Sequence, residues 1–583
     1  MKMEAIASHG GERVAAALAA HGVRFVFTLC GGHISPILTA SKARGIRIVD
    51  VRDEATAVFA ADAVARLSGV PGVAAVTAGP GLANTITALK NAQLAQSPLV
   101  LFGGAAPTAL QGRGALQDID QRPLIAPHVK LFTKIRAVRE LGPAVDEAFA
   151  VARSGVPGPV CIECPVDLLY DEASIRQWYA EAAGKGTSIP DRLLRFYLNR
   201  HVEKMFAGSS AAAAPQVRSV APPSARASSV AAAAAALARA ERPLLVIGSQ
   251  ALALAAEAPR IAAAVARLGI PVYLSGMARG LLGRDHVLQM RHQRRAALRE
   301  SDCVLLAGVP CDFRLDYGRH VRRSATLIAA NRSAKEARMN RRPDIAAIGD
   351  AGLFLERLAA PLAQAGRRWT SWIEELRTRD LKREAEIEQQ AAPPGEQVNP
   401  IAFLRALDQA AGESAVMVAD GGDFVATASY ILHPRAPLSW LDPGVFGTLG
   451  VGAGFALGAA LCRPGSEVWI IYGDGACGYS LMEFDTFVRH GIPVIAVVGN
   501  DAGWTQIARE QVKMLHDDVG TVLARSAYHE VAAGFGAEGI LLTKTADAPA
   551  ALARARAAAK AGKPVLLNVW LDETDFREGS ISM

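Results

Sequence analysis

The chain has 583 residues, of which 51% are hydrophobic and 20% charged, and its formal net charge at pH 7 is +7. At roughly 150 residues per domain, this length predicts three or four folded domains and excludes a single core. No window holds about 18 strongly apolar residues without charges, and no basic stripe is interleaved with aromatic residues, so we expect neither a membrane span nor a nucleic-acid-binding surface.

Cysteine usage and the N-terminus favour the cytoplasm. Seven cysteines in a chain of this length do not form a disulfide framework. Cys161 and Cys164 have CxxC spacing, but they lie in a strand-like run without a second such pair, which favours a buried strand over a redox or zinc site. The first 18 residues mix acids and bases where a signal peptide needs an apolar run. We therefore expect a cytoplasmic protein.

Three blocks alternate strand-like apolar runs with helix-like segments, which predicts an α/β fold of three doubly wound parallel-sheet domains. The first block has predicted strands at 24–29, 46–51, 72–77, 98–102 and 160–164. In the second block they lie at 243–247, 272–274, 303–307 and 326–330, and in the third at 415–418, 467–472, 493–498 and 564–569.

Two linkers separate these blocks. Residues 211–230 are rich in Ala, Ser and Pro and are expected to be flexible. The segment before them, 189–205, has an amphipathic pattern whose apolar face we expect to dock on the protein body. That face consists of Leu193, Leu194, Tyr197, Leu198, Val202 and Met205. A charged helix at 372–391 precedes the third block. The expected domains are 1–185, 228–365 and 399–575, joined by a helix and flexible linker at 186–227 and a linker at 366–398, with a C-terminal tail at 576–583.

The third block contains the motif with the clearest chemistry. One predicted strand ends in Gly473-Asp474-Gly475, a crossover helix is expected at 481–490, and the next strand ends at Asn500. Parallel strands joined by a crossover end on the same edge of the sheet, where helix N-termini favour a phosphate. Asp474 and Asn500 should therefore converge on a hard cation that bridges a diphosphate.

This arrangement resembles the Gly-Asp-Gly…Asn signature of thiamine-diphosphate enzymes. The resemblance implies that Asp474, Asn500 and the backbone carbonyl of Ala502 hold Mg²⁺. Members of this family often carry an asparagine just before the metal asparagine, whereas this chain has Gly499 there. It also implies three domains: pyrimidine-binding, central nucleotide-binding-like and diphosphate-binding.

Glu54 follows a predicted strand where a helix begins, a position that by itself suits a helix-capping acid. In the family a glutamate at this place hydrogen-bonds the aminopyrimidine ring and assists deprotonation of the thiazolium ring. Leu449 resembles the residue that bends the cofactor beneath its two rings. The cofactor contacts that the resemblance implies are Gly32, Thr77, Asn84, Gly422, Asp423, Phe424, Gly447, Leu449, Gly473, Gly475, Ala476, Gly503 and Trp504.

Residues 27–36 and 499–506 resemble the acetolactate-synthase-like group that is regarded as 2-hydroxyacyl-CoA lyases. Gln121 ends a segment as in the acyl-CoA enzymes, whereas Arg509 and Pro310 stand where acetolactate synthases carry tryptophan and arginine. The resemblance thus implies cleavage of a 2-hydroxyacyl-CoA to formyl-CoA and an aldehyde or ketone. Acetolactate synthesis and decarboxylation of oxalyl-CoA remain open as alternatives, and a catalytically silent scaffold is disfavoured because Glu54, Asp474 and Asn500 are all present.

A coenzyme A ester requires phosphate-binding groups, for which the candidates are Arg279, Arg284, Arg314 and Arg332. ADP is left open as an activator and FAD is disfavoured. The group that moves the proton of the substrate hydroxyl is expected among His33, Gln117, Gln506, Glu483 and Glu510, with His33 favoured. The family assembles each site between subunits, which implies a homodimer or homotetramer. The C-terminal tail could close over the site or be a frayed end.

Overall fold

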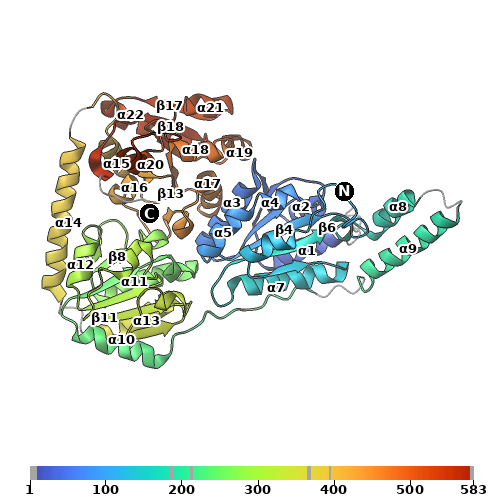
Figure 1. Cartoon of the computed structure of the whole chain (residues 1–583), viewed down its shortest axis with the longest axis horizontal. Coiled ribbons are helices and arrows are strands. Elements are labelled where there is room, and N and C mark those ends of the chain that lie inside the picture. The colour runs from blue at the N-terminus through green and yellow to red at the C-terminus, as the bar shows by residue number, and fades with distance from the viewer. Residues whose placement is uncertain (1–8, 184–187, 210–213, 364–368, 393–394, 578–583) are drawn as a thin grey trace. The chain divides into compact units, whose positions relative to one another are not determined.

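The computed structural model describes residues 9–183, 188–209, 214–363, 369–392 and 395–577. The chain divides into two compact units, Met1–Ala65 with Val70–Ala221, and Arg66–Gly69 with Pro222–Met583. The first unit contains one six-stranded sheet and the second contains two, and the strand pairs within each sheet are parallel. The predicted class of three α/β domains is confirmed (Figure 1).

The sheet of the first unit has the strand order β2-β1-β3-β4-β6-β5. Its strands are β1 Phe25–Leu29, β2 Arg47–Asp50, β3 Gly72–Val76, β4 Leu99–Ala105, β5 Phe132–Lys134 and β6 Pro159–Pro165. Its helices are α1 Gly10–Ala20, α2 Ser35–Ala43, α3 Glu54–Ser68, α4 Pro80–Ala83, α5 Ile86–Leu94, α6 Arg122–Ile125, α7 Leu141–Arg153, α8 Glu172–Ala182 and α9 Ile189–Phe206. Every residue of β3, β4 and β6 is buried, as expected for strands covered on both faces.

The first sheet of the second unit has the order β12-β11-β10-β7-β8-β9. Its strands are β7 Pro243–Ile247, β8 Val272–Leu274, β9 Gln289–Met290, β10 Cys303–Ala307, β11 Thr326–Asn331 and β12 Ile345–Ile348. Its helices are α10 Ala227–Arg239, α11 Ala258–Leu268, α12 Arg294–Glu300 and α13 Ala351–Leu362, and the long α14 Thr370–Ala391 follows. Trp369 and Trp372, near the start of α14, donate indole hydrogen bonds to Ala240 and Pro243 and so fasten that helix to this domain.

The second sheet of this unit has the order β14-β13-β15-β16-β18-β17. Its strands are β13 Val416–Asp420, β14 Trp440–Leu441, β15 Val468–Gly473, β16 Ile495–Asn500, β17 Glu538–Leu542 and β18 Val565–Trp570. Its helices are α15 Pro400–Ala410, α16 Asp423–Ile431, α17 Val451–Cys462, α18 Asp474–Ser480, α19 Glu483–His490, α20 Thr505–Leu515, α21 Tyr528–Gly534 and α22 Ala548–Lys560. The crossover after Gly473 is thus two helices, where the sequence predicts one at 481–490.

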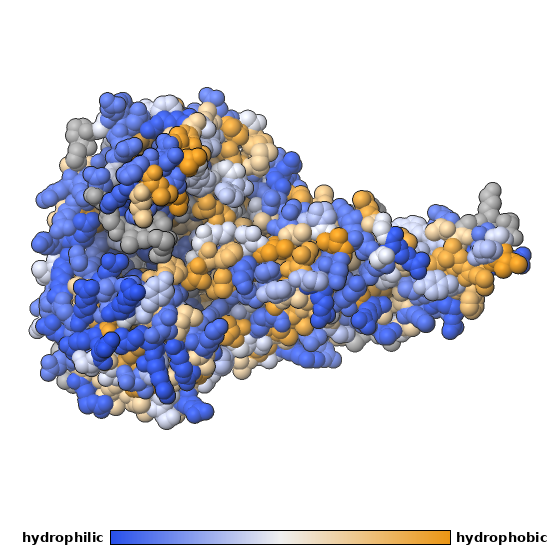
Figure 2. Space-filling view, in the orientation of Figure 1, coloured by the Kyte–Doolittle hydropathy of each residue, from blue (hydrophilic) through white to orange (hydrophobic). Residues whose placement is uncertain are grey.

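The amphipathic segment at 189–205 forms α9, and only its C-terminal half docks. Leu198, Val202 and Met205 are buried against the first unit, as expected. Leu193, Leu194 and Tyr197, which were expected on the docked face, are 65%, 44% and 52% exposed. Figure 2 shows hydrophobic side chains gathered over the α8–α9 hairpin. At about 100° per residue, Leu193 and Tyr197 lie on the side of the helix away from Val202, while Leu194 lies nearer the docked side but in the N-terminal half, which does not dock.

Within the described ranges, no helix is long and apolar enough to cross a bilayer.

Candidate active site

The Gly-Asp-Gly motif and Asn500 lie on one edge of the last sheet. β15 and β16 are adjacent and in register from Trp469 with Ile495 to Gly473 with Gly499, so Asp474 and Asn500 follow or end neighbouring strands. The carboxylate of Asp474 accepts hydrogen bonds from the backbone N–H groups of Gly475 (2.8 Å) and Gly503 (3.1 Å). The predicted convergence of the two loops is therefore present.

Asn500 is fully buried, and hydrogen bonds from its side-chain nitrogen fix the orientation of its amide. Its Nδ2 donates to Oδ1 of Asn568 (3.2 Å) and to the carbonyl of Ser526 (3.4 Å). Oδ1 is thereby turned toward the Asp474 loop, where it accepts from the N–H of Ala502 at 3.3 Å. Ala502 itself has a left-handed backbone (φ +60°), which strains a non-glycine residue and reshapes the loop.

The electrostatics of this loop suit a cation. The pKa of Asp474 is raised to about 7, mainly by burial and secondly by the nearby carboxylate of Asp501. A cation would relieve both effects, since it favours the charged form of each carboxylate. Asp474, Asn500 and the carbonyl of Ala502 offer the oxygen ligands that Mg²⁺ prefers. The residues present therefore fit a magnesium diphosphate.

Two aromatic rings explain the glycines around this loop. A Cβ added to Gly475 would lie 2.4 Å from the indole of Trp504, and one added to Gly499 would lie 2.4 Å from the ring of Phe424. Both distances are far inside van der Waals contact. The departure from the usual asparagine at position 499 thus has a local cause, because Phe424 fills the space that a side chain there would need.

A buried carboxylate shapes the second glycine-rich loop. Asp420, at the end of β13, accepts hydrogen bonds from the N–H groups of Gly450 (3.1 Å) and Gly452 (2.7 Å), and burial raises its pKa to about 7. Gly447 and Gly450 have positive φ angles of 64° and 90°. Leu449 between them is partly exposed, as a residue that meets a ligand must be.

The first unit holds the predicted partner carboxylate. Glu54 is the first residue of α3 and is 7% exposed. Its Oε2 accepts a hydrogen bond from Nδ2 of Asn84 (3.1 Å), and a Cβ added to Gly81 would lie 3.2 Å from its Oε1. The Thr77–Asn84 segment therefore packs against Glu54, with Gly81 leaving room for the carboxylate.

His33, Thr77 and Gln117 form a second group in the same unit. Nδ1 of His33 lies 3.0 Å from the hydroxyl of Thr77, and that hydroxyl lies 3.5 Å from Oε1 of Gln117. Burial lowers the pKa of His33. Because the Thr77 hydroxyl donates to Oε1 of Gln117, it accepts from Nδ1–H of His33, and the neutral ring then presents Nε2 as a proton acceptor. Gly32, beside it, is exposed and has open space where a side chain would stand.

The second unit contains a cavity of about 1060 Å³ between its two sheets. One end of the cavity is formed by Gly421, Gly422 and Gln506, next to the loop of Gly473–Gly475. The remainder of the cavity lies against the central domain. Seven arginines and two aspartates line it. The arginines are Arg279, Arg291, Arg294, Arg295, Arg314, Arg383 and Arg577. The cavity is therefore strongly basic.

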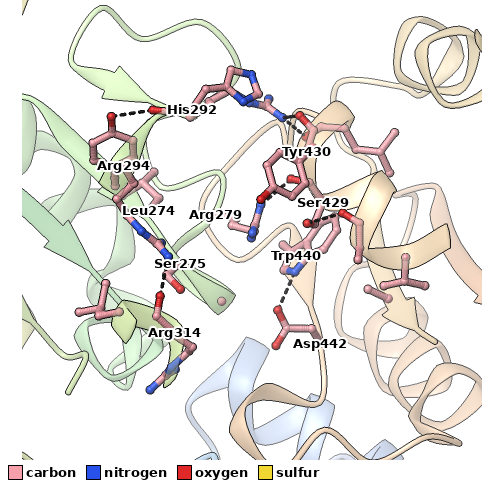
Figure 3. A pocket seen from close by; sticks show the side chains of 18 of the residues that line it. Leu274, Ser275, Arg279, His292, Arg294, Arg314, Ser429, Tyr430, Trp440 and Asp442 are labelled. Carbon is pink, nitrogen blue, oxygen red and sulfur yellow. Dashed lines mark hydrogen bonds between the residues drawn. The ribbon is translucent and has the colours of Figure 1, made fainter. Parts of the chain in front are cut away.

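Figure 3 shows how the two domains of this unit share the cavity wall. Arg279 donates to the carbonyl of Ser429 (2.7 Å) and lies over the ring of Trp440. Across the cavity, Arg294 donates to the carbonyl of Arg314 (2.6 Å). Burial lowers the pKa of both Arg279 and Arg294, so an anion here would meet poorly hydrated guanidinium groups.

Several predicted residues lie elsewhere. Arg332 is buried against Asp350 (2.6 Å) and Arg284 pairs with Asp408 (3.1 Å), so neither joins the arginines of the cavity. Glu483 is 1% exposed, accepts from Thr486 (2.5 Å) within α19 and does not line the cavity. Sequence reasoning missed Arg291, Arg294, Arg295, Arg383 and Arg577. The first three lie in the basic 291–295 stretch, which was their only signal.

Asp423 and Arg509 form an ion pair. Asp423 begins α16 and its carboxylate pairs with Arg509 of α20 at 2.8 Å. Gln506, one turn earlier on α20, lies against Gly422, since a Cβ there would be 2.6 Å from its Oε1. Glu510, one residue beyond Arg509, is partly buried.

Three parallel α/β domains, with Gly473-Asp474-Gly475 and Asn500 on one strand edge of the last, are the arrangement expected of an enzyme that binds a diphosphate cofactor. Three family models match the chain: the N-terminal TPP binding domain of the thiamine pyrophosphate enzymes at residues 8–124, their central domain at 230–358, and their C-terminal TPP binding domain at 420–569. The chain belongs to the thiamine pyrophosphate enzymes, and its cofactor is thiamine diphosphate.

Full-length relatives refine this assignment. The chain is 51% identical to 2-hydroxyacyl-CoA lyase 2 of Homo sapiens over 587 aligned positions, which cover 99% of this chain and 92% of the relative. It is 50% identical to 2-hydroxyacyl-CoA lyase 2 of Caenorhabditis elegans, with coverage of 99% and 91%. A probable acetolactate synthase of Mycobacterium bovis is 35% identical, with coverage of 97% and 96%. The similarity to the lyases agrees with the group that the sequence motifs favour.

Proposed function

We propose that this enzyme is a 2-hydroxyacyl-CoA lyase, which cleaves a 2-hydroxyacyl-CoA to formyl-CoA and an aldehyde or ketone. The observation that carries the proposal is the basic cavity that runs from Gly422 and Gln506 to Arg294 and Arg314. A coenzyme A ester is long and anionic, so its phosphates can meet the arginines while its acyl end reaches the cofactor. The identity to the lyases also supports it.

Thiamine diphosphate, when bound, supplies a carbon nucleophile and an electron sink for cleavage of a bond beside a carbonyl. The residues of this chain would hold and orient it. Asp474, Asn500 and the carbonyl of Ala502 are the proposed ligands of Mg²⁺. Glu54 is proposed to hold a proton on the aminopyrimidine ring, with Asn84 fixing one of its oxygens.

Cleavage of the bond also requires removal of the proton from the substrate hydroxyl. We propose His33 as the acceptor, because its lowered pKa keeps the ring neutral near pH 7 and Thr77 occupies its Nδ1. Gln117 and Gln506 are proposed as hydrogen-bonding partners of the substrate. The remaining cofactor contacts are proposed as the resemblance implies them.

A parallel incubation tests the function. The purified enzyme with thiamine diphosphate and Mg²⁺ is supplied with 2-hydroxyisobutyryl-CoA, a long-chain 2-hydroxyacyl-CoA, oxalyl-CoA or pyruvate. We expect formyl-CoA from at least one 2-hydroxyacyl-CoA. Consumption of pyruvate alone would instead support acetolactate chemistry, and carbon dioxide from oxalyl-CoA alone would support the decarboxylase.

The same preparation addresses the regulation and assembly that we propose. ADP is proposed as a second occupant of the basic cavity, and competition between ADP and coenzyme A in calorimetry would test it. A homodimer or homotetramer is the proposed assembly, which light scattering on a sizing column would measure. Colourless protein is expected, since FAD is not proposed.

A further inference from the structure

Gln121 is a buried amide that touches neither the cavity nor the solvent. It is 3% exposed. Its Oε1 accepts from the N–H of Gly79 (2.9 Å), and its Nε2 donates to the carbonyl of Gly104 (3.1 Å) and to Oε2 of Glu163 (3.0 Å). Each polar atom of this amide thus has a partner, which is what a buried polar group requires.

Glu163 fixes the orientation of that amide. It is 3% exposed on β6, and its Oε1 pairs with the ammonium group of Lys134 on β5 at 3.0 Å. Because a carboxylate only accepts hydrogen bonds, it must face the NH₂ side of Gln121. The oxygen of Gln121 is therefore directed to Gly79 and cannot be exchanged with the nitrogen without loss.

The two glycines that Gln121 holds are those against which the predicted catalytic side chains rest. A Cβ added to Gly79 (φ +63°) would lie 2.8 Å from the backbone oxygen of Gln117. One added to Gly104 would lie 2.5 Å from Cβ of His33. A single amide thereby links the support of Gln117 to the support of His33.

We propose that Gln121, oriented by Glu163, is a positioning residue that sets the spacing of His33 and Gln117 without contacting substrate. The proposal rests on the proposed function for the reaction that it serves. A misplacement of about 1 Å far from the reacting atoms can cost on the order of 100-fold in rate. Loss of Gln121 should therefore lower kcat and leave KM nearly unchanged.

The variant Gln121→Met keeps the length of the side chain but removes all three hydrogen bonds. We expect kcat for a 2-hydroxyacyl-CoA to fall about 10- to 100-fold with KM within about twofold. Hydrogen exchange of the 77–84 segment, measured without added cofactor, should become faster. Gln111→Met is the matched control, since Gln111 makes one backbone hydrogen bond at the end of the same strand region, to Ala106, and should change neither quantity.

An exchange of the two residues separates positioning from mere packing. Gln121→Glu faces two carboxylates toward each other and should lower kcat. Adding Glu163→Gln restores a donor between them and should recover part of the loss. Unchanged kcat and unchanged exchange in Gln121→Met, or no recovery in the double variant, would overturn the proposal. If the wild type cleaves no 2-hydroxyacyl-CoA, the proposed function fails, while the exchange of the 77–84 segment still decides the role of Gln121.

Discussion

Substitution of Gly499 by alanine tests the account of the metal loop. The added Cβ would lie 2.4 Å from the ring of Phe424, which is only 5% exposed, whereas carbon atoms in contact stand about 3.5–4.0 Å apart. The ring would therefore have to move by more than about 1 Å in a packed interior. Such overpacking typically costs about 1–3 kcal/mol.

The entropic gain from replacing glycine by alanine opposes this steric cost but is smaller. Alanine gains about 0.5–1 kcal/mol over glycine in a strand, because glycine loses more backbone freedom on folding. The net destabilisation should be about 0.5–2 kcal/mol, which in a protein of this size lowers Tm by a few degrees. The affinity for Mg²⁺ should fall as well, because Gly499 directly precedes Asn500, a proposed ligand of the ion.

Thermal unfolding with and without thiamine diphosphate and Mg²⁺ measures both effects. Gly478→Ala is the control, because Gly478 lies in α18 with nothing within 4 Å of an added Cβ. That change should be neutral or slightly stabilising. Phe424→Leu combined with Gly499→Ala should regain stability. Equal Tm values for the two alanine variants would refute the steric explanation of Gly499.

Three further outcomes are expected. Glu54→Gln should lower kcat at least about 100-fold while cofactor binding measured by calorimetry persists, and full activity would exclude the proton role. The pKa of Asp420 is raised to about 7, whereas the unfolded chain loses this proton near pH 4. Between about pH 4 and 7 the native protein therefore holds a proton that the unfolded chain has lost, and the free energy of unfolding falls as the pH rises through this range. The Tm of the wild type minus that of Asp420→Asn should therefore decrease from pH 5 to pH 8, and a constant difference would contradict the shift. Arg294→Ala should raise KM for an acyl-CoA about tenfold, or roughly 1.4 kcal/mol, with kcat unchanged, whereas the exposed Arg319→Ala should have no effect.

The sequence predicts the central strands well because they are buried on both faces. β7, β8 and β10 match their predicted limits, since a strand covered by helices is a continuous apolar run between turn residues. β9 and β14 have two residues each and β5 has three, too few to give a pattern. β12 and β17 mix small or exposed residues into their runs, so their alternation is weak.

The site divides in the same way. The Gly-Asp-Gly and Asn500 motif is local, so strand order alone brings its parts together. The arginine cluster is not local. Arg279 follows η6 Gly276–Ala278, Arg294 begins α12, and Arg314 lies in η7 Phe313–Gly318. The sequence does not tell the ion-paired Arg284 and Arg332 from the cavity residue Arg294. Their carboxylate partners are 124 and 18 residues away, and no sequence pattern indicates those pairs.

The cavity lies wholly within the second unit, while Glu54 belongs to the first. On the proposed function, substitutions in α12, η7 and α16 would change which acyl carrier the enzyme accepts without altering Glu54. A library of variants confined to the cavity wall would therefore vary substrate binding separately from the proposed activation of the cofactor.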